Sequence, residues 1–183
     1  MNGPEGSADA LSIGPTVILI GPMAVGKSTV GREVALQRQE PFADLDTLIA
    51  EEAGRSIPEI FAVDGEEFFR ALEATVLKQA LEHHCGVLAL GGGAPLRAES
   101  AARLRGRPVV LLEVEEDTVG ERIQRSTNRP MLDGPDALAR WRELTAARMP
   151  VYRELARWTV RCGRDSIPAV ARRIDELVRE ETA

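Results

Sequence analysis

Long apolar runs and clustered cysteines are both missing from this sequence of 183 residues. No apolar stretch approaches the roughly 20 residues that a membrane span needs, and the N-terminus lacks the basic start and apolar core of a signal peptide. Cys85 and Cys162 stand in no metal-binding spacing, which favours free thiols in a reducing compartment. We therefore expect a cytoplasmic protein with no membrane partner.

Positive charge is also in deficit, with 23 Lys and Arg against 29 Asp and Glu and a net charge of −6. This balance argues against nucleic acid as the main partner. Arginines grouped within an acidic chain favour instead a site for a small anion. Hydrophobic residues make up 44% and charged residues 28%, which is typical of a globular protein.

The chain is long enough for one domain with a substantial core. Residues 1–15 are rich in Gly, Ala and Ser, and we expect them to form a disordered leader before a single domain over residues 16–183. No internal repeat is visible in the sequence. No exposed apolar helix face forces a dimer, so we expect a monomer.

Apolar runs alternate with helical patterns, which is typical of an α/β protein with a parallel sheet covered on both faces. The expected strands are Thr16–Ile20, a short segment ending near Asp44, Gly86–Leu90, Val109–Glu113 and Trp158–Arg161. The expected helices are Val30–Gln37, Gly65–Glu82, Glu116–Gln124, Gly134–Ala147 and Ile167–Glu180. Ligands of such sheets bind beyond the carboxyl ends of the strands, and the motifs below fall at or near such ends.

The segment from Gly21 to Thr29, GPMAVGKST, follows an apolar run and leads into a helical pattern. It matches the GxxxxGK[ST] loop, which binds nucleotide phosphates through backbone N–H groups and a helix N-terminus. We predict that Lys27 reaches the β- and γ-phosphates of ATP and that the Ser28 hydroxyl ligates Mg²⁺. A glycine-rich turn with a surface lysine is the alternative. The predicted ATP-binding residues of the loop are Ala24, Val25, Gly26, Lys27, Ser28 and Thr29.

Asp44 and Asp46 follow at the end of the short strand. On an extended segment, residues i and i+2 point the same way, so the two carboxylates would leave the strand end together. One could order water around Mg²⁺ while the other accepts a proton from a hydroxyl nucleophile. The alternative is an aspartate that caps a helix beginning near Thr47.

Gly91, Gly92 and Gly93 directly follow another expected strand. Three glycines at a strand end allow a backbone to approach a ligand closely, and we favour this interpretation over a flexible turn. Arg70 and Glu73 lie three residues apart on one expected helix face. A guanidinium suits recognition of a carboxylate, but the spacing by itself favours a surface ion pair.

Residues 125–136 are polar, with two prolines and no helical period. This composition suits a mobile lid that carries Arg129 onto the γ-phosphate, where an arginine offsets charge in the transition state. A solvated basic loop is the alternative. Arg148 stands at an expected helix end, where a cation interacts favourably with the helix dipole.

Together these segments resemble the shikimate kinase family of small P-loop kinases. The resemblance rests on GPMAVGKSTVGREVA, FADLDTLI, GRSIPEIFAVDGEEFFRALE, VLALGGGA, RSTNRPML and RMPVYRELA, and it covers the chain from about Val17 to Leu177. It implies a three-layer P-loop NTPase fold, with a five-stranded parallel sheet flanked by helices, a helical substrate-binding region near residues 44–75 and a mobile lid. It also implies ATP-dependent phosphorylation of the 3-hydroxyl of shikimate in aromatic amino-acid (chorismate) biosynthesis, with ATP and shikimate as partners.

The same resemblance assigns roles to single residues. For ATP, it implies Lys27 and Ser28 at the phosphates and Mg²⁺, Asp44 in the water shell of the metal, Arg129 closing from the lid, Arg122 against adenine and Arg164 near that end. For the acceptor, it implies Arg70 and Arg148 on the shikimate carboxylate, Gly92 and Gly93 along the ring, and Asp46 at the hydroxyls and as base. The expected catalytic residues are therefore Lys27, Asp46 and Arg129.

Ala24 departs from the family, which often has a third loop glycine at this position. The GxxxxGK[ST] pattern stays intact, and we expect activity to survive. Another small-molecule P-loop kinase, such as a gluconate kinase or an antibiotic phosphotransferase, would share the loop and lid but would not require Asp46, Arg70 and Arg148 together. A non-catalytic ATP-binding module is a further alternative, disfavoured by the presence of Lys27 and Asp46.

Overall fold

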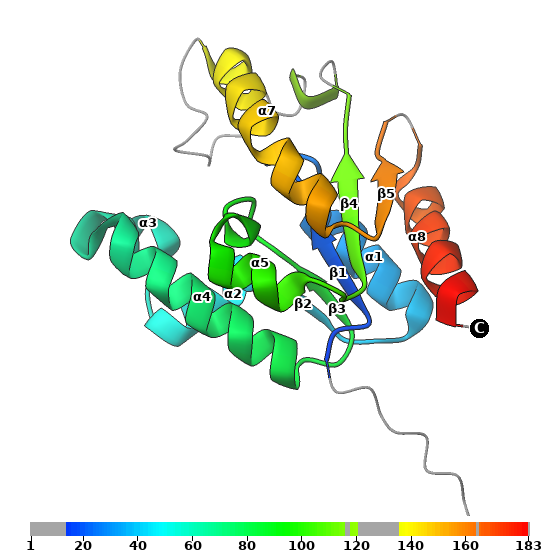
Figure 1. Cartoon of the computed structure of the whole chain (residues 1–183), viewed down its shortest axis with the longest axis horizontal. Helices are drawn as coiled ribbons and strands as arrows, with labels where there is room; N and C mark the ends of the chain where they lie inside the picture. The colour runs from blue at the N-terminus through cyan, green and yellow to red at the C-terminus, as the bar shows by residue number, and fades with distance from the viewer. Residues whose placement is uncertain (1–13, 116–117, 121–135, 164, 183) are drawn as a thin grey trace, which may run out of the picture.

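A single parallel sheet forms the centre of the protein (Figure 1). The structure, a computed structural model, describes residues 14–115, 118–120, 136–163 and 165–182. In these residues five strands pair in the order β2-β3-β1-β4-β5, all parallel. Their bounds are β1 (Val17–Ile20), β2 (Phe42–Asp44), β3 (Val87–Ala89), β4 (Val109–Glu113) and β5 (Trp158–Arg161). The predicted five-stranded parallel sheet is thereby confirmed.

The central strand β1 shows why the strands read as unbroken apolar runs. Ile18 and Ile20 point into the core on one face of the sheet, and Val17 and Leu19 point into the core on the other. Both faces are covered, so every side chain of β1 is buried. A strand buried on two faces needs apolar residues at consecutive positions rather than an alternation with polar residues.

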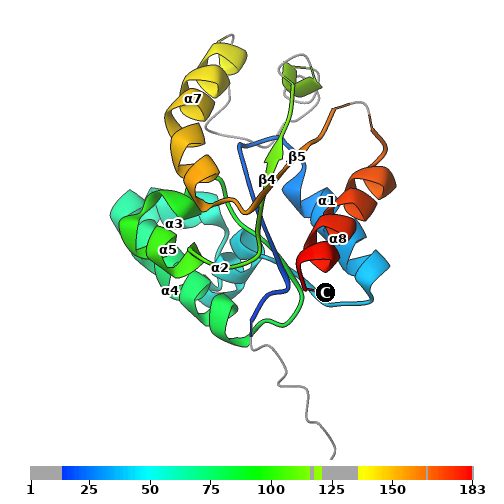
Figure 2. The same ribbon diagram turned by 45° about the vertical axis from the view of Figure 1, so that its right-hand side comes forward.

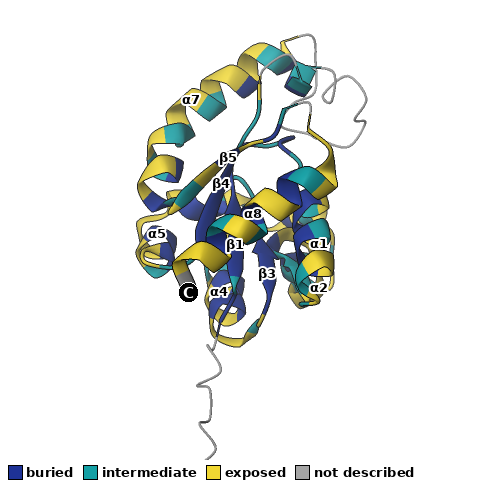
Figure 3. Cartoon of the chain, turned by 90° about the vertical axis from the view of Figure 1, so that its right-hand side faces the viewer, coloured by how far each residue is buried: buried dark blue, intermediate teal, exposed yellow. Residues whose placement is uncertain are grey.

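Helices cover both faces of this sheet (Figure 2). On one face α1 (Lys27–Arg38) packs against α8 (Ile167–Thr182). The other face carries α4 (Gly65–His83), α5 (Ala98–Leu104) and α7 (Ala137–Leu155), with α2 (Leu45–Ala53), α3 (Ile57–Val63) and the 3₁₀ helix η1 (Ala94–Leu96) beside them. Exposed residues lie on the outer faces of the helices, and buried residues lie on the central strands β1, β3 and β4 (Figure 3). The predicted arrangement of helix, sheet and helix layers is confirmed.

The helix expected over Gly134–Ala147 is longer than predicted, since α7 runs from Ala137 to Leu155 with Pro150 inside it. Proline removes one backbone donor and normally ends a helix. Beyond the proline, however, Tyr152 and Leu155 are buried in the core. Their packing holds the last turn in place, so the predicted helix end was wrong.

Two short helices, α3 and α5, were not predicted, and α2 was considered only as an alternative, beginning near Thr47. The helices α3 and α5 have seven residues each, which is too few to show a periodic pattern. Of the helix expected over Glu116–Gln124, the described residues 118–120 are helical. The remainder of that segment, lid residues 125–135 and leader residues 1–13 lie outside the described residues. No described helix combines the length and hydropathy that a membrane crossing requires.

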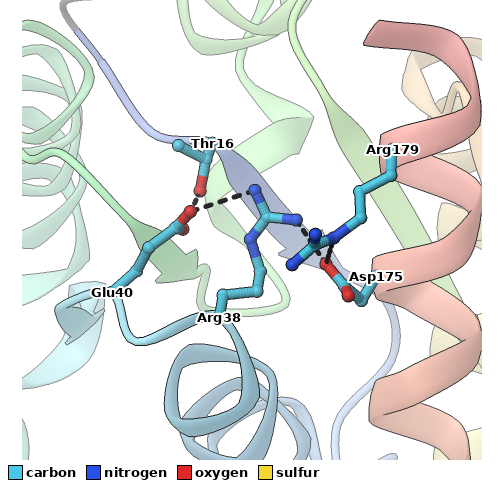
Figure 4. A network of polar contacts seen from close by, with 5 residues as sticks. All are labelled: Thr16, Arg38, Glu40, Asp175 and Arg179. Carbon is cyan, nitrogen blue, oxygen red and sulfur yellow. Dashed lines mark hydrogen bonds and ion pairs between the residues drawn. The ribbon is translucent and has the colours of Figure 1, made fainter. Parts of the chain in front are cut away.

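A network of charges joins α1 to α8 at the end of the sheet where β1 begins (Figure 4). Arg38 bonds to Glu40 through Nη2 at 3.0 Å and to Asp175 through Nη1 at 2.6 Å. Arg179 adds a bond from Nε to the same Asp175 oxygen at 2.9 Å, and the Thr16 hydroxyl donates to Glu40. The network therefore connects the start of β1, the end of α1 and the middle of α8.

The network also fixes the ionisation of Asp175. Burial alone would raise the pKa of this carboxyl, but the hydrogen bonds and charges of Arg179 and Arg38 outweigh burial and lower it. A carboxyl with a lowered folded-state pKa contributes stability above its unfolded pKa of about 4. That stability is lost as the pH falls through the folded-state pKa.

We predict that Asp175→Asn lowers the free energy of unfolding by about 1–3 kcal/mol at pH 7, because the half-buried Arg38 loses one of its two carboxylate partners and keeps only Glu40. The difference from the wild type should shrink as the pH falls below 4, and denaturant titration at several pH values measures it. The exposed neighbour Glu176 supplies the control, because Glu176→Gln should change stability by less than about 0.5 kcal/mol. Equal losses in the two variants at pH 7 would contradict the assigned role of the network.

Candidate active site

The loop between β1 and α1 has a glycine at each end, in a position where another residue would be strained or would clash. Gly26, the N-cap of α1, has a φ of 97°, in the left-handed region that favours glycine. A Cβ at Gly21 would lie 2.4 Å from the carbonyl oxygen of Leu112. The N-terminus of α1 directly follows the loop, and its first turn contains no acidic residue. No carboxylate in that turn therefore offsets the positive end of the helix dipole. This geometry suits an anion such as a phosphate.

Lys27 extends over this loop. Its Nζ donates to the carbonyl oxygens of Gly21 at 2.8 Å and Pro22 at 2.9 Å, which holds the ammonium group against the start of the loop. Val25 is buried in the core, so it can offer a ligand its backbone alone, whereas Thr29 is exposed in the first turn of α1.

Ser28 and Asp44 meet at the carboxyl end of β2. The Ser28 hydroxyl donates to Asp44 Oδ2 at 2.5 Å, and the other carboxylate oxygen of Asp44 accepts from the Asp46 N–H at 3.0 Å. Asp44 is thus the N-cap of α2, which is the alternative considered for these aspartates. The expectation that Asp46 extends from a strand was wrong, because it lies in the first turn of α2.

The residues present fit a magnesium ion bound together with a nucleotide. A hydroxyl and a carboxylate are hard oxygen donors, and Mg²⁺ keeps several waters and takes few protein ligands beside phosphates. In the part of the chain that the structure describes, no group of three or more His, Cys, Asp or Glu side chains could hold a metal by itself. Ser28 and Asp44 would therefore supply the protein's share of the coordination shell.

Each of the three glycines after β3 lies against a different polar side chain. A Cβ at Gly91 would lie 2.5 Å from Asp46 Oδ1, and one at Gly93 would lie 2.4 Å from Arg70 Nη1. At Gly92 it would lie 3.4 Å from Arg148 Nη1. The missing side chains therefore let a carboxylate and two guanidinium groups converge beside the phosphate loop.

Arg70 is held by a carboxylate that sequence reasoning placed at the surface. Glu73 is 2% exposed, and its Oε2 accepts from Arg70 Nη1 at 2.9 Å. Burial raises the pKa of Glu73, although the bond to Arg70 opposes that shift. The expected surface ion pair is therefore wrong, since Glu73 anchors Arg70 from inside the protein.

The Asp46 carboxylate lies among several charges. Burial raises its pKa, and the neighbouring charge of Asp44 raises it further, while Lys27 and Arg70 act in the opposite direction. A carboxylate with a raised pKa accepts a proton more readily than an exposed aspartate. Its position against Gly91 places this group between the phosphate loop and the arginines.

Arg148 lies in the interior of α7, so its assignment to a helix end was wrong. Four residues further along the same helix, Tyr152 donates its hydroxyl to the Gly92 carbonyl at 2.5 Å. Burial raises the pKa of Tyr152, although Arg148 opposes that shift. Sequence reasoning missed Tyr152; its i+4 spacing from Arg148 would have indicated it, had the helix been extended through Pro150.

These groups together suit phosphoryl transfer from a nucleotide to the hydroxyl of an anionic acceptor. The loop can bind phosphates, the solvent-exposed Asp46 carboxylate can take a hydroxyl proton, and two guanidinium groups can bind an acid group. Arg122, Arg129 and Arg164, which were predicted at the ATP, lie outside the described residues.

A family model for shikimate kinase matches residues 23–179. The chain belongs to the shikimate kinase family. Among its relatives are the shikimate kinases of Mycobacterium tuberculosis (strain CDC 1551 / Oshkosh), 42% identical over 87% of this chain and 91% of the relative, and Rhodococcus jostii (strain RHA1), 40% identical over 80% and 88%. Like the family, the chain is a P-loop kinase that uses ATP.

Solved structures agree with this assignment. The shikimate kinase from Acinetobacter baumannii in complex with shikimate is similar with a TM-score of 0.86 at 34% identity, covering 93% of this chain and 96% of that chain. A gluconokinase from Sinorhizobium meliloti 1021 is similar with a TM-score of 0.54 at 17% identity, covering 93% and 97%. The second likeness shows a shared fold alone.

We predict that Gly93→Ala impairs the acceptor side of the site, because its methyl group would displace the Arg70 guanidinium. The KM for shikimate, used as test acceptor, should rise about ten- to hundredfold, while the KM for ATP changes less than about twofold. Gly92→Ala should have a smaller effect, since its Cβ would meet no atom closer than 3.4 Å. Initial rates measured against each substrate decide the point, and a larger rise in the KM for ATP would contradict it.

Proposed function

We propose that this chain transfers the γ-phosphoryl group of ATP to the 3-hydroxyl of shikimate, forming shikimate 3-phosphate for aromatic amino-acid biosynthesis. The observation that supports this proposal most strongly is the convergence of Asp46, Arg148 and Arg70 on the three glycines beside the phosphate loop. Shikimate carries one carboxylate and adjacent hydroxyls, so it needs cationic groups on one side and a proton acceptor on the other.

On the ATP side, the backbone N–H groups of the loop and the N-terminus of α1 bind the phosphates, and Lys27 moves from the carbonyls it now contacts onto the β- and γ-phosphate oxygens. Ser28 and Asp44 would hold Mg²⁺, directly or through water. The metal, when bound, neutralises charge on the phosphates.

On the acceptor side, Arg70 and Arg148 bind the shikimate carboxylate, with Gly92 and Gly93 along the ring. The 3-hydroxyl then lies near Asp46, which takes its proton as the oxygen attacks the γ-phosphorus. One P–O bond forms as the bond to the β–γ bridging oxygen breaks, and ADP leaves with the electron pair. Glu73 keeps Arg70 in place before the acceptor arrives, which lowers the entropy lost on binding.

Several roles rest on the resemblance to the family. Arg129 closes from a lid over residues 125–136, Arg122 lies against adenine and Arg164 lies near that end. A leader over residues 1–15, a monomeric state and a cytoplasmic location complete the proposal.

The alternative is phosphorylation of a different small molecule. Gluconate also carries a carboxylate and hydroxyls, so two arginines could bind it as well. Shikimate is favoured because the acceptor side combines Asp46 with both arginines around a glycine-lined strand end. A non-catalytic ATP-binding module would have no use for that acceptor side.

The deciding experiment is a coupled ADP-release assay with Mg-ATP, run with shikimate and with gluconate. Saturable turnover with shikimate and none with gluconate is the expected result. Turnover with gluconate alone, or ADP binding without turnover on either compound, would overturn the proposed acceptor.

We predict that Asp46→Asn lowers kcat about a hundredfold or more, because the amide cannot accept the hydroxyl proton. The KM for ATP should change little. The melting temperature at pH 7 should stay the same or rise, since a carboxyl whose folded-state pKa is raised is less stable when ionised in the folded chain than in the unfolded chain. A kcat within threefold of the wild type would remove Asp46 from proton transfer.

A further inference from the structure

A small apolar cluster separate from the two main cores lies over the phosphate loop. Its buried members are Ala24, Val119, Ala137 and Trp141, and Met23, Val114 and Leu138 pack around them. Two of these residues belong to the phosphate loop itself, and three belong to α7. The proposed reaction uses none of these side chains, so the cluster needs another explanation.

Trp141 makes the polar contact of this cluster. The indole is 5% exposed, and its Nε1 donates to the Met23 carbonyl at 2.9 Å. A buried indole N–H needs an acceptor, and here the acceptor is the backbone of the loop rather than of the helix beside it. The contact therefore fixes one peptide of the phosphate loop to a helix more than a hundred residues away in the chain.

The next residue of the loop, Ala24, has a φ of 65°. This left-handed conformation is unfavourable for a residue with a Cβ, and it persists where the surroundings hold it. Ala24 is 9% exposed, and its side chain lies in the cluster with Trp141. The contacts with α7 therefore cover the loop at Ala24, whose positive φ is unfavourable for a residue with a Cβ.

The same face of α7 extends to the acceptor side. Trp141, Arg148 and Tyr152 are spaced i, i+7 and i+11, which places them on one helix face at 3.6 residues per turn. Trp141 contacts the loop at Met23, whereas Tyr152 contacts Gly92. Figure 1 shows α7 rising beside the carboxyl end of β4, so one helix spans both halves of the site.

We propose that Trp141 is a positioning residue for nucleotide binding. Its indole holds the Met23 carbonyl and covers Ala24, which keeps the loop in the conformation that receives phosphates. The contact is made before the nucleotide arrives, so it lowers the conformational entropy that the loop loses when the nucleotide binds. The proposal rests on the proposed function to the extent that the loop binds ATP, and it does not depend on which acceptor is phosphorylated.

The test compares Trp141→Phe with Trp158→Phe, which changes the second tryptophan of the chain on strand β5. Calorimetric titration with Mg-ADP, without acceptor, gives the Kd of each variant. Trp141→Phe should raise the Kd about three- to tenfold, the effect of one lost hydrogen bond, and Trp158→Phe less than twofold. The KM for shikimate should stay within about twofold in both. An unchanged Kd in Trp141→Phe, or equal changes in the two variants, would overturn the proposal.

A second variant separates the hydrogen bond from packing. Replacing the indole of Trp141 by a benzothiophene, in the Trp158→Phe background, exchanges the N–H for sulfur and keeps the ring shape. The Kd for Mg-ADP should again rise about three- to tenfold with the melting temperature nearly unchanged. A Kd equal to that of the background would overturn the role of the N–H even if Trp141→Phe fails to fold.

The contribution of Ala24 is tested by a double-mutant cycle with Ala24→Gly. Glycine adopts a positive φ without strain, so the loop should depend less on Trp141. The rise in the Kd caused by Trp141→Phe should therefore be smaller in the Ala24→Gly background. The same rise in both backgrounds would overturn the claim that Trp141 holds this turn. Because calorimetry reads ADP binding alone, a failed phosphorylation assay and a failed positioning role remain distinguishable.

Discussion

The close approach of charged side chains to a bare backbone is the constraint on which this active site depends. Gly91, Gly92 and Gly93 bring together residues from α2, α4 and α7, which are far apart in the sequence. At Gly91 and Gly93 a carboxylate and a guanidinium group occupy the space that a side chain would otherwise fill, while the Arg148 guanidinium lies within ordinary contact distance of Gly92. The parallel sheet makes this possible, because the carboxyl end of β3 lies beside that of β1, where the phosphate loop begins.

Burial and neighbouring charges act in opposite directions on the carboxyl groups of this site. Asp46 and Glu73 are carboxyls whose pKa values burial raises, and Arg70 opposes the shift in both. One arginine therefore faces two carboxyl groups with different tasks. Glu73 fixes its position, while Asp46 is the proton acceptor that we propose. Such a site is organised before the substrate enters, so less of the binding free energy is spent on ordering side chains.

Sequence reasoning succeeded where local patterns carry the information. β4 and β5 were predicted to the residue, and the phosphate loop follows from its spacing. It failed where tertiary packing decides: Glu73 is buried by its neighbours, and Pro150 stays inside a helix because Tyr152 and Leu155 pack beyond it. In the sequence, Asp46, Arg70 and Arg148 stand in three separate motifs. Their approach to the glycines could not be predicted, because the distances between these motifs depend on the order of the strands in the sheet.

The charge network around Arg38 has a consequence for how this enzyme could change. It lies where β1 begins, whereas the active site lies where the parallel strands end, so the sheet separates the two along its length. Rigidity near a reaction centre often costs turnover. Substitutions that add contacts around α8 and the end of α1 should therefore stabilise the fold with little loss of turnover. The same region could offset the stability lost when substitutions near Gly91, Gly92 and Gly93 change the acceptor specificity.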